Sequence, residues 1–244
     1  MAETLRRVLN AGGAAGLEAE EGAAEGGSLL LLGGPGSGKT ALLFAAALEI
    51  AGEGRGPVLF LTRRPLQSLP SRSGSALDPL RLQKIRFQYP PSTQELLRFL
   101  CSAHESRGPT PALLLVDSLE DFLEEEAGTQ DTAYLAALLL DTAAFFSQRA
   151  GPGRGCGLMV ALQTPGDGDS DGGGGALLLS LLLRYFPARC WLQPGPCGLR
   201  VCLEPGEGIP RAEWSLVLGP DGEMSATPCA TQAGDPSTGP GAQG

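Results

Sequence analysis

The sequence predicts an α/β fold, a mainly parallel sheet with helices on both faces and an antiparallel meander at its C-terminal end. Three observations support this prediction. Short apolar runs alternate with helix-forming segments, a glycine-rich loop joins the first run to the first long helix, and polar residues follow several runs directly. Alternation of this kind, with short connections, is typical of parallel strands covered by helices, which hold ligands at the carboxyl ends of the strands.

The chain divides into three predicted parts. Residues 1–27 are rich in Ala, Gly and Glu, contain one short helical stretch at Leu5–Leu9, and are expected to form a flexible leader. Residues 28–224 carry the alternating pattern and form the predicted core. Residues 225–244 are rich in Pro, Gly, Ser and Thr, bury too little apolar surface to offset the entropy of ordering, and are expected to be a disordered tail.

The first half of the core contains three strand patterns and two helix patterns. Continuous apolar runs predict buried strands, because a parallel strand covered on both faces has no polar side. Thr40–Ala51 lacks helix breakers and ends at Gly52, and Ser92–His104 is amphipathic with Glu95 three residues after Ser92, a capping pattern. The predicted strands are Ser28–Leu32, Pro57–Leu61 and Ala112–Val116.

The second half of the core continues the alternation and then changes. Composition predicts helices at Tyr134–Gln148 and Ala176–Arg184, and the apolar run Leu158–Leu162 predicts a fourth parallel strand between them. Three short β-rich runs follow, with turn residues between them, which predicts an antiparallel meander that extends the sheet. These runs are Cys190–Leu192, Leu199–Leu203 and Trp214–Leu218.

Composition argues against several classes of protein. A formal net charge of −9 does not suit a protein that coats duplex DNA, which needs a net basic face. Six cysteines, one histidine and no signal peptide fit a reducing intracellular compartment. There Cys190, Cys197 and Cys202 are better explained as buried thiols than as zinc ligands. No apolar run reaches the roughly 18 residues of a membrane span, so no membrane association is expected.

The segment Gly33–Thr40 matches the phosphate-binding loop pattern and lies between a predicted strand and a predicted helix. Its glycines let backbone N–H groups face phosphates, and the helix that follows adds the positive end of its dipole. Lys39 would act as a catalytic residue that neutralises terminal phosphate oxygens, and Thr40 would bind Mg²⁺. Only Lys39 and Lys84 are lysines, so a lysine in this position is informative. The predicted nucleotide-binding residues are Gly33, Gly34, Pro35, Gly36, Ser37, Gly38, Lys39 and Thr40.

Two polar residues end apolar strands downstream of this loop. Asp117 is placed like the second magnesium-associated carboxylate of P-loop proteins, and the alternative is a cap for the next helix. Gln163 is a candidate catalytic residue whose amide would contact the γ-phosphate or orient the attacking water, and the alternative is an ordinary loop glutamine. ATP and Mg²⁺ are therefore the predicted ligands.

Several features together resemble the core of the RecA-type recombinases, over about residues 28–224. The resemblance is closest to the eukaryotic recombinase paralogs. Among these, Leu59–Leu66 and Leu82–Pro91 resemble the ATPases that associate with SWIM zinc-finger proteins. The matching features of the RecA-type core are Val116-Asp117-Ser118, the strand ending in Gln163 with its glycine-rich loop, Arg189–Leu192 and Arg200–Leu203.

The resemblance implies a function in homologous recombination repair of DNA damage. It implies an ATP-binding subunit of a Shu-type complex with a SWIM-domain protein. Such a complex binds single-stranded DNA and supports filaments of a RecA-family recombinase and its paralogs in the nucleus. Two other classes stay open: a pseudo-ATPase scaffold whose nucleotide only stabilises the fold, and a P-loop kinase. A kinase needs an arginine-rich lid over the site, and the meander after Ala188 suits a recombinase core better.

The chain departs from the family at the end of the second strand. Members of the family place a glutamate there to activate water, whereas this chain has Thr62–Pro65 with two arginines, so slow hydrolysis is expected. Glu120 and Asp121, just after Asp117, are the carboxylates nearest in sequence that would substitute. An acidic start to the next helix explains them better, because carboxylates favour the positive end of the helix dipole.

Further departures concern DNA contact and assembly. The loop after Gln163, which touches DNA in the family, carries Asp167, Asp169 and Asp171 and no basic residue, so direct DNA contact is not expected there. Residues 1–27 are too short for the family's N-terminal DNA-binding domain, so long self-polymerisation is not expected.

Two more segments have a functional and a structural interpretation. Phe44–Ala47 matches the Phe-x-x-Ala pattern with which family members dock onto recombinase, but core packing of the helix is the preferred interpretation. A basic group follows the second strand and would bind single-stranded DNA, with Phe87 and Tyr89 stacking bases, or equally an acidic partner. The basic residues are Arg63, Arg64, Arg72, Arg81, Lys84 and Arg86.

Overall fold

The structure, a computed structural model, describes residues 1–10, 26–72, 78–123, 129–164, 174–196, 198–219 and 223–229. Its strands are β1 (Ser28–Gly33), β2 (Val58–Leu61), β3 (Ser71–Arg72), β4 (Ile85–Gln88), β5 (Leu113–Val116), β6 (Gly157–Gln163), β7 (Ala188–Gly195), β8 (Gly198–Glu204), β9 (Ala212–Leu218) and β10 (Glu223–Pro228). Its helices are α1 (Ala2–Asn10), α2 (Lys39–Gly52), α3 (Pro79–Leu82), α4 (Thr93–Cys101), α5 (Thr129–Ala150) and α6 (Gly174–Tyr185), with the 3₁₀ helices η1 (Ala103–Glu105) and η2 (Leu119–Phe122).

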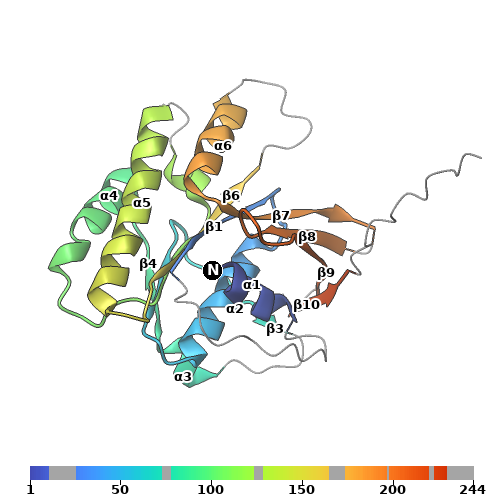
Figure 1. The fold of residues 1–244 in the computed structure, drawn as a ribbon, viewed down its shortest axis with the longest axis horizontal. Coiled ribbons are helices and arrows are strands. Elements are labelled where there is room, and N and C mark those ends of the chain that lie inside the picture. Colours follow the sequence, from blue (N-terminus) through green and yellow to red (C-terminus); the bar gives the residue numbers. More distant parts are fainter. Residues whose placement is uncertain are drawn as a thin grey trace, which may run out of the picture.

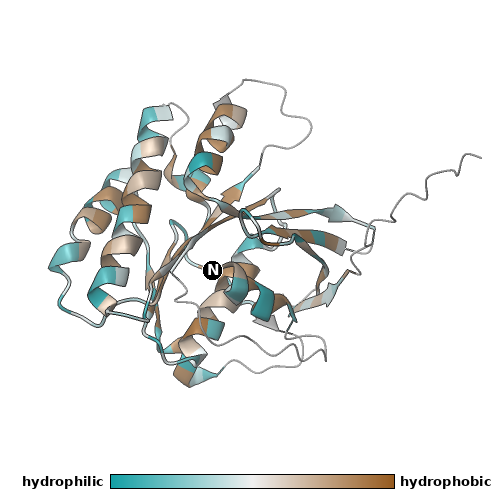
Figure 2. Ribbon diagram, viewed as in Figure 1, coloured by the Kyte–Doolittle hydropathy of each residue, from teal (hydrophilic) through white to brown (hydrophobic). Residues whose placement is uncertain are grey.

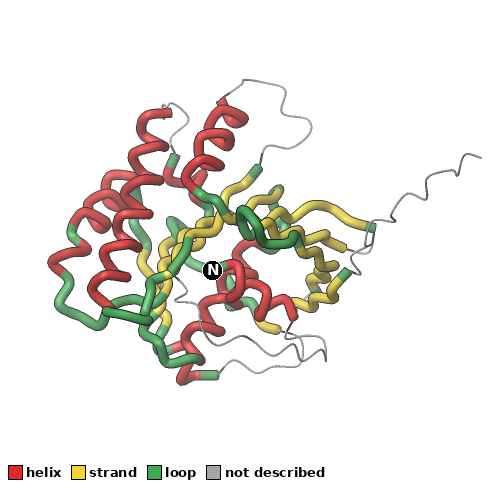
Figure 3. The backbone as a smooth tube through the Cα atoms, in the orientation of Figure 1, coloured by secondary structure: helices red, strands yellow, loops and turns green. Residues whose placement is uncertain are grey.

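Within these ranges the strands form one ten-stranded sheet in the order β3-β10-β9-β8-β7-β1-β6-β5-β2-β4 (Figure 1). β1 pairs in parallel with both β6 and β7, and β5, β2 and β4 continue the parallel half. β8, β9 and β10 follow β7 by antiparallel pairing and form the meander. Helices lie on both sides of the sheet (Figure 3), so the predicted fold class is confirmed.

Each face of the sheet has its own apolar core. Leu29 and Leu31 of β1 pack in the core with α1 and α2, while Leu30 and Leu32 point to the opposite face and pack with α4, α5 and α6. Figure 2 shows the central strands mostly in the hydrophobic colour. Because successive strand residues point to opposite faces, a strand covered on both faces must be apolar throughout. This is why the strands of the parallel half could be recognised in the sequence.

The N-terminal segment differs from the flexible leader that composition suggested. Residues 2–10 form α1, and Leu5, Val8 and Leu9 are buried against α2 and the meander. The indole Nε1 of Trp214 in β9 donates a hydrogen bond to Oδ1 of Asn10 at 2.8 Å. One helical turn of apolar residues is too short to stand out from a low-complexity segment, although its packing makes it part of the core. Residues 11–25 lie outside the described part of the chain.

The C-terminal boundary also differs from the prediction. The sequence predicts that a disordered tail begins at Ser225, but residues 223–228 form β10, which pairs with β9 and buries Met224 and Ala226. Apolar residues at alternate positions of β10 form its buried face. The small polar residues between and after them made this pattern hard to recognise in the sequence. Residues 230–244 lie outside the described residues, so the rest of the tail stays a prediction.

Two elements, α4 and β4, can be compared with the sequence prediction in detail. The Ser92 hydroxyl accepts a hydrogen bond from the N–H of Glu95 at 3.2 Å and caps α4, as the capping pattern predicted. β4 was not predicted, because Ile85 and Phe87 alternate with Arg86 and Gln88 at an edge of the sheet. Among the described helices, none has the length and apolar character needed to cross a membrane.

Candidate functional site

A cleft of about 1050 Å³ opens at the carboxyl ends of the parallel strands. The loop between β1 and α2 forms its floor, the segment after β2 forms one wall, and the residues after β5 and β6 form another. Leu218 and Gly219, at the end of β9, close it from the meander side. The structure therefore brings the predicted phosphate loop, Asp117 and Gln163 to a single cavity.

The loop between β1 and α2 is shaped by its glycines. Gly36 and Gly38 adopt positive φ angles of 68° and 80°, which side chains other than glycine rarely tolerate. Gly38 is the N-cap of α2 and has no side chain that could accept a hydrogen bond. The first N–H groups of the helix therefore lack a side-chain cap and face the cleft. A helix start of this kind is a ready site for an anionic oxygen, and phosphate supplies one.

Lys39 is the first residue of α2 and is only 7% exposed. Its Nζ donates hydrogen bonds to the carbonyl oxygens of Gly33 at 2.8 Å and Gly34 at 2.7 Å. Burial lowers the pKa of Lys39, and the charges of Glu120 and Asp117 oppose that shift. The ammonium group is thus surrounded by acceptors and fits a negatively charged ligand.

Asp117 follows β5 and is 4% exposed. The hydroxyl of Thr40 donates a hydrogen bond to its Oδ2 at 2.8 Å, while its Oδ1 is buried and has no partner within the described structure. Burial raises the pKa of Asp117; Glu120 raises it further, while the Thr40 hydrogen bond, the charge of Lys39 and the Ser118 N–H lower it. The capping alternative receives no support, because Ser118 holds the N-cap position of η2.

The Thr40 and Asp117 oxygens fit a magnesium ion. Mg²⁺ takes hard oxygen ligands and keeps several waters, so one hydroxyl, one carboxylate and nucleotide phosphates are a usual set. A cation beside Asp117 would also compensate a carboxylate that is otherwise buried with one oxygen unpaired. These residues therefore suit Mg²⁺ with a nucleotide.

Gln163 ends β6 and lines the cleft. Its backbone N–H donates a hydrogen bond to Oε2 of Glu120 at 2.9 Å, a contact between two residues that are far apart in the sequence. Gln163 lies at the edge of the cleft, and its role as a γ-phosphate sensor stays a prediction. Asp167, Asp169 and Asp171, in the loop after it, lie outside the described residues.

The segment after β2 supplies no carboxylate to the cleft. Thr62 is buried and its hydroxyl donates to the carbonyl of Arg64 at 3.1 Å. The Arg63 guanidinium donates to the carbonyl of Pro91 at 3.0 Å and to that of Asp121. Nε of Arg64 lies 3.6 Å from Oδ2 of Asp121, with its side chain 82% exposed. Both arginines thus contact the segment that follows Asp117.

The basic residues predicted as one DNA or partner surface are separated in the structure. Arg63 and Arg64 follow the carboxyl end of β2, whereas Lys84 precedes the amino end of β4, which pairs in register with β2. Nζ of Lys84 donates to the carbonyl of Ala51 at 3.0 Å, and Nε of Arg81 lies 3.6 Å from Oδ2 of Asp78.

The rest of this basic group is also divided. Arg86 lies within β4 and lines a separate pocket, and nothing is described of the Arg72 side chain. The rings of Phe87 and Tyr89 stack with centroids 6.3 Å apart, and Phe87 also packs against Phe60. A continuous basic stripe with aromatic rings is therefore not formed by the described side chains.

Two further sequence interpretations can be compared with the structure. Phe44–Ala47 is almost completely buried in the core around α2, so the core interpretation of this motif holds. Cys190 and Cys202 are buried free thiols, and Cys197 lies outside the described residues. The described residues contain no group of three His, Cys, Asp or Glu residues that could hold a metal ion. The contact of Leu218 with the cleft had no sequence signal, because it depends on tertiary packing. Glu120 was considered in the sequence analysis only for its position just after Asp117, and the structure places it in the cleft.

Comparison with known sequences gives close relatives. No known family profile matches the chain. It is 66% identical over 223 residues to the ATPase SWSAP1 of Homo sapiens, covering 89% of this chain and 96% of that protein. It is 59% identical over 239 residues to the ATPase SWSAP1 of Mus musculus, covering 96% of this chain and 84% of that protein.

Comparison with solved structures gives more distant neighbours with the same fold. The RadB recombinase superposes with a TM-score of 0.54 at 17% identity, covering 84% of this chain and 92% of that one. The solved ATPase domain of another protein superposes with a TM-score of 0.56 at 11% identity, covering 84% and 86%. The chain therefore has a RecA-like fold, as the sequence resemblance implied.

Proposed function

The chain belongs to the family of the ATPase SWSAP1, and from this premise we propose that it binds ATP with Mg²⁺, hydrolyses it slowly and acts in homologous recombination. One observation carries the nucleotide part of the proposal. The buried Asp117 carboxylate is bonded to Thr40 and lies beside Lys39, at the opening of an uncapped helix. This combination has no evident structural purpose without a polyphosphate and its cation.

Four residues of the cleft have a part in the proposed reaction. Lys39 would exchange its two carbonyl acceptors for phosphate oxygens, which are charged and therefore stronger acceptors. Thr40 and Asp117 would hold the cation directly and through its waters. The bound Mg²⁺ would neutralise charge on the phosphates during transfer. The side chain of Gln163 would contact the γ-phosphate and report hydrolysis to the loop that follows β6.

The recombination part of the proposal rests on the family and on the RecA-like fold. The partners would be a SWIM-domain zinc-finger protein, single-stranded DNA, and a RecA-family recombinase with its paralogs, in the nucleus at sites of DNA damage. A net charge of −9 requires DNA contact to be local or to be made mainly by the partner. Long self-polymerisation is not part of the proposal.

A second candidate function is a scaffold that binds ATP without turnover. The observation that favours it is the segment after β2, which lines the cleft with Thr62 and Arg64 and with no carboxylate. In a scaffold, nucleotide would stabilise the fold by binding only the native state. Partner association would then survive the loss of hydrolysis.

The two lysines of the chain provide a matched experiment. ATP binding and turnover would be measured on the protein alone, with single-stranded DNA, and with the SWIM-domain protein, for Lys39→Ala and Lys84→Ala. We expect Lys39→Ala to lower ATP affinity by about 100-fold, since it removes a charge-assisted contact from a buried site. Lys84→Ala should leave ATP affinity intact, because Lys84 bonds only the end of α2 among the described residues.

Three outcomes separate the candidates. Turnover that requires Lys39 and rises with DNA supports the recombination ATPase. Binding that requires Lys39, with no turnover under any condition, supports the scaffold. Equal ATP affinity of the wild type and Lys39→Ala contradicts both.

A further inference from the structure

We infer that Glu120 is the carboxylate that activates water in this protein, and that Arg63 is the residue that positions it. This inference rests on the proposed ATP hydrolysis and names the group that performs its proton transfer. It places the catalytic carboxylate on the 3₁₀ turn after β5, at a site where the neighbouring strand, β2, supplies none.

Glu120 projects into the cleft from η2. The turn follows Ser118, which has a φ of 53° and is the non-glycine residue with a left-handed backbone within the described ranges. Such conformations cost energy and are concentrated at functional sites. Here the sharp turn after Asp117 directs η2 back over the end of β6, where Glu120 lines the same cavity as Lys39 and Asp117.

The Glu120 carboxylate is held by one oxygen. Oε2 accepts the 2.9 Å hydrogen bond from the N–H of Gln163, and Oε1 has no hydrogen bond among the described residues. The held oxygen fixes the direction of the side chain, and the other can accept a hydrogen bond from a water in the cleft. Glu120 lies close enough to the other charged groups of the cleft to affect them. Its charge raises the pKa of Asp117 and opposes the lowering of the Lys39 pKa by burial.

The neighbouring carboxylate, Asp121, is already engaged. Its Oδ2 pairs with Nε of Arg64 at 3.6 Å, and its carbonyl oxygen accepts from Arg63. Of the two acidic residues on η2, Glu120 is held by a backbone N–H, whereas Asp121 contacts an exposed arginine side chain.

Arg63 fastens the turn that carries Glu120. Its guanidinium bridges the carbonyl of Asp121 on η2 and the carbonyl of Pro91 ahead of α4, and thereby joins three segments that meet at the rim of the cleft. The hydroxyl of Thr93 makes a second tie, to the carbonyl of Phe122 at the end of η2. The arginine after β2 thus holds in place a carboxylate from the next strand along the sheet.

The reaction balances with these groups. The oxygen of a water held by Oε1 of Glu120 would form the new bond to the γ-phosphorus. The bond from that phosphorus to the bridging oxygen would break, with its electron pair staying on ADP. One water proton would pass to the Glu120 carboxylate, which would return it to solvent as inorganic phosphate leaves.

The test compares three variants with the wild type for ATP affinity, kcat and thermal midpoint, using the complex with the SWIM-domain protein and single-stranded DNA. Glu120→Gln keeps an oxygen that can accept from Gln163 but loses the carboxylate, whereas Glu120→Ala loses both. If Glu120 only ties η2 to β6, Glu120→Gln should turn over like the wild type. We expect both variants to lose about 100-fold or more in kcat with ATP affinity within about threefold, and Asp121→Asn to keep most of its kcat.

The results distinguish this inference from the function on which it rests. Wild-type turnover in Glu120→Gln, in a protein whose hydrolysis depends on Lys39, would overturn the inference and leave the proposed function standing. Absence of hydrolysis by the wild-type complex would overturn both. If Glu120→Gln or Glu120→Ala does not fold, Glu120→Asp retains the charge, and its kcat should fall about tenfold because the carboxylate is withdrawn by one methylene.

The positioning role of Arg63 has its own readout. Arg63→Ala should lower kcat about tenfold with little change in ATP affinity, because it loosens η2 without touching the phosphate loop. Arg63→Lys keeps one donor and should recover part of the loss. A rise in KM with kcat unchanged would instead show that Arg63 serves nucleotide binding, and would contradict this role.

Discussion

The nucleotide cleft and the outer face of the meander each hold a network of charged side chains, but the two networks are built differently. In the cleft, Lys39 and Asp117 are almost fully buried, and Asp117 keeps one oxygen unpaired within the described structure. On the meander, charged residues alternate along the strands with the buried Val201, Leu203 and Trp214 and therefore point away from the core.

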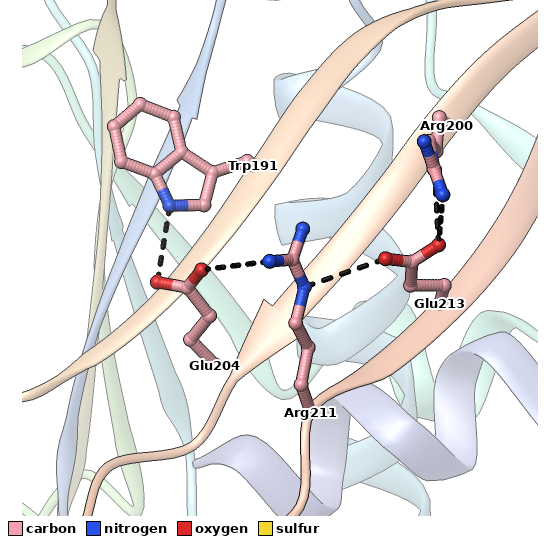
Figure 4. Close-up of polar contacts among 5 residues, drawn as sticks. All are labelled: Trp191, Arg200, Glu204, Arg211 and Glu213. Carbon is pink, nitrogen blue, oxygen red and sulfur yellow. Dashed lines mark hydrogen bonds and ion pairs between the residues drawn. The ribbon is translucent and has the colours of Figure 1, made fainter. Parts of the chain in front are cut away.

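Figure 4 shows the meander network. The indole N–H of Trp191 donates to Glu204 at 3.4 Å, and Arg211 lies between Glu204 at 3.7 Å and Glu213 at 3.4 Å. Arg200 completes the row with a 2.9 Å hydrogen bond from its Nε to Glu213. Each carboxylate in this row has an internal partner, and each ion pair is partly exposed.

This contrast indicates which of the two networks is suited to a ligand. Exposed, mutually paired charges contribute little and need nothing else, because water already solvates them. Buried charges with an unpaired oxygen reduce stability until an ion or a ligand completes them. By this criterion the cleft is the candidate functional site, and the meander row is a cross-strand support.

The largest expected effect on stability comes from comparing two glycines of the phosphate-loop pattern, Gly33 and Gly34. A Cβ on Gly33 would lie 2.6 Å from Oγ of Ser37 and 2.9 Å from the carbonyl of Leu192, while a Cβ on Gly34 would meet nothing within 4 Å. We expect Gly33→Ala to lower the free energy of unfolding by about 2 kcal/mol, because the backbone of β7 cannot move aside. Gly34→Ala should stay within about 0.5 kcal/mol in the same denaturant titration. Equal effects would contradict the close packing of β1 on β7.

The substitution Asp117→Asn should have an effect of the opposite sign and raise the stability of the protein. The raised pKa of Asp117 means that its contribution to stability is present below the ordinary pKa of a carboxyl and is lost as pH rises through the folded value. At pH 7 without nucleotide, Asp117→Asn should therefore raise the thermal midpoint by about 2–4 °C, equivalent to about 1 kcal/mol. It should also weaken Mg²⁺-dependent ATP binding about tenfold.

The control for this prediction is Asp141→Asn. Asp141 lies exposed on α5, so neither the thermal midpoint nor ATP binding should change. A midpoint that falls in Asp117→Asn would mean that the carboxylate already has a stabilising partner, and would remove the argument for a cation.

The smallest effect concerns the meander row. Glu213→Gln removes the partner of Arg200 and Arg211 and should lower the thermal midpoint by about 1 °C at low salt. The difference from the wild type should vanish at about 1 M salt, where charges are screened beyond roughly 3 Å. A decrease of the thermal midpoint that is large or independent of salt would show that the meander row contributes strongly to stability, and would contradict this interpretation.

Most of the parallel half of the fold could be predicted from residue order. Leu113–Val116 and Leu158–Leu162 are apolar throughout because both of their faces are covered. That pattern can be recognised in the sequence without knowledge of the rest of the fold. The packing of α1 and the existence of β10 could not be predicted, although a short helical stretch at Leu5–Leu9 was. Their apolar residues are few, and they are recognised as core only by their contacts with α2 and β9. The edge strand β4 was obscured for a related reason: half of its side chains face solvent.

The candidate site shows the same division. Residue order alone was enough to propose the phosphate loop, Lys39, Thr40 and Asp117 as one site, because a strand, a glycine turn and a helix start are local features with a fixed chemistry. The structure places Lys39, Thr40 and Asp117 in one cleft. It took the folded chain to show that Glu120 bonds Gln163, that Arg63 contacts η2, and that the basic side chains that the structure describes do not form one surface. These contacts join residues more than 20 positions apart, and their geometry depends on how the strands pack side by side, which no local pattern encodes.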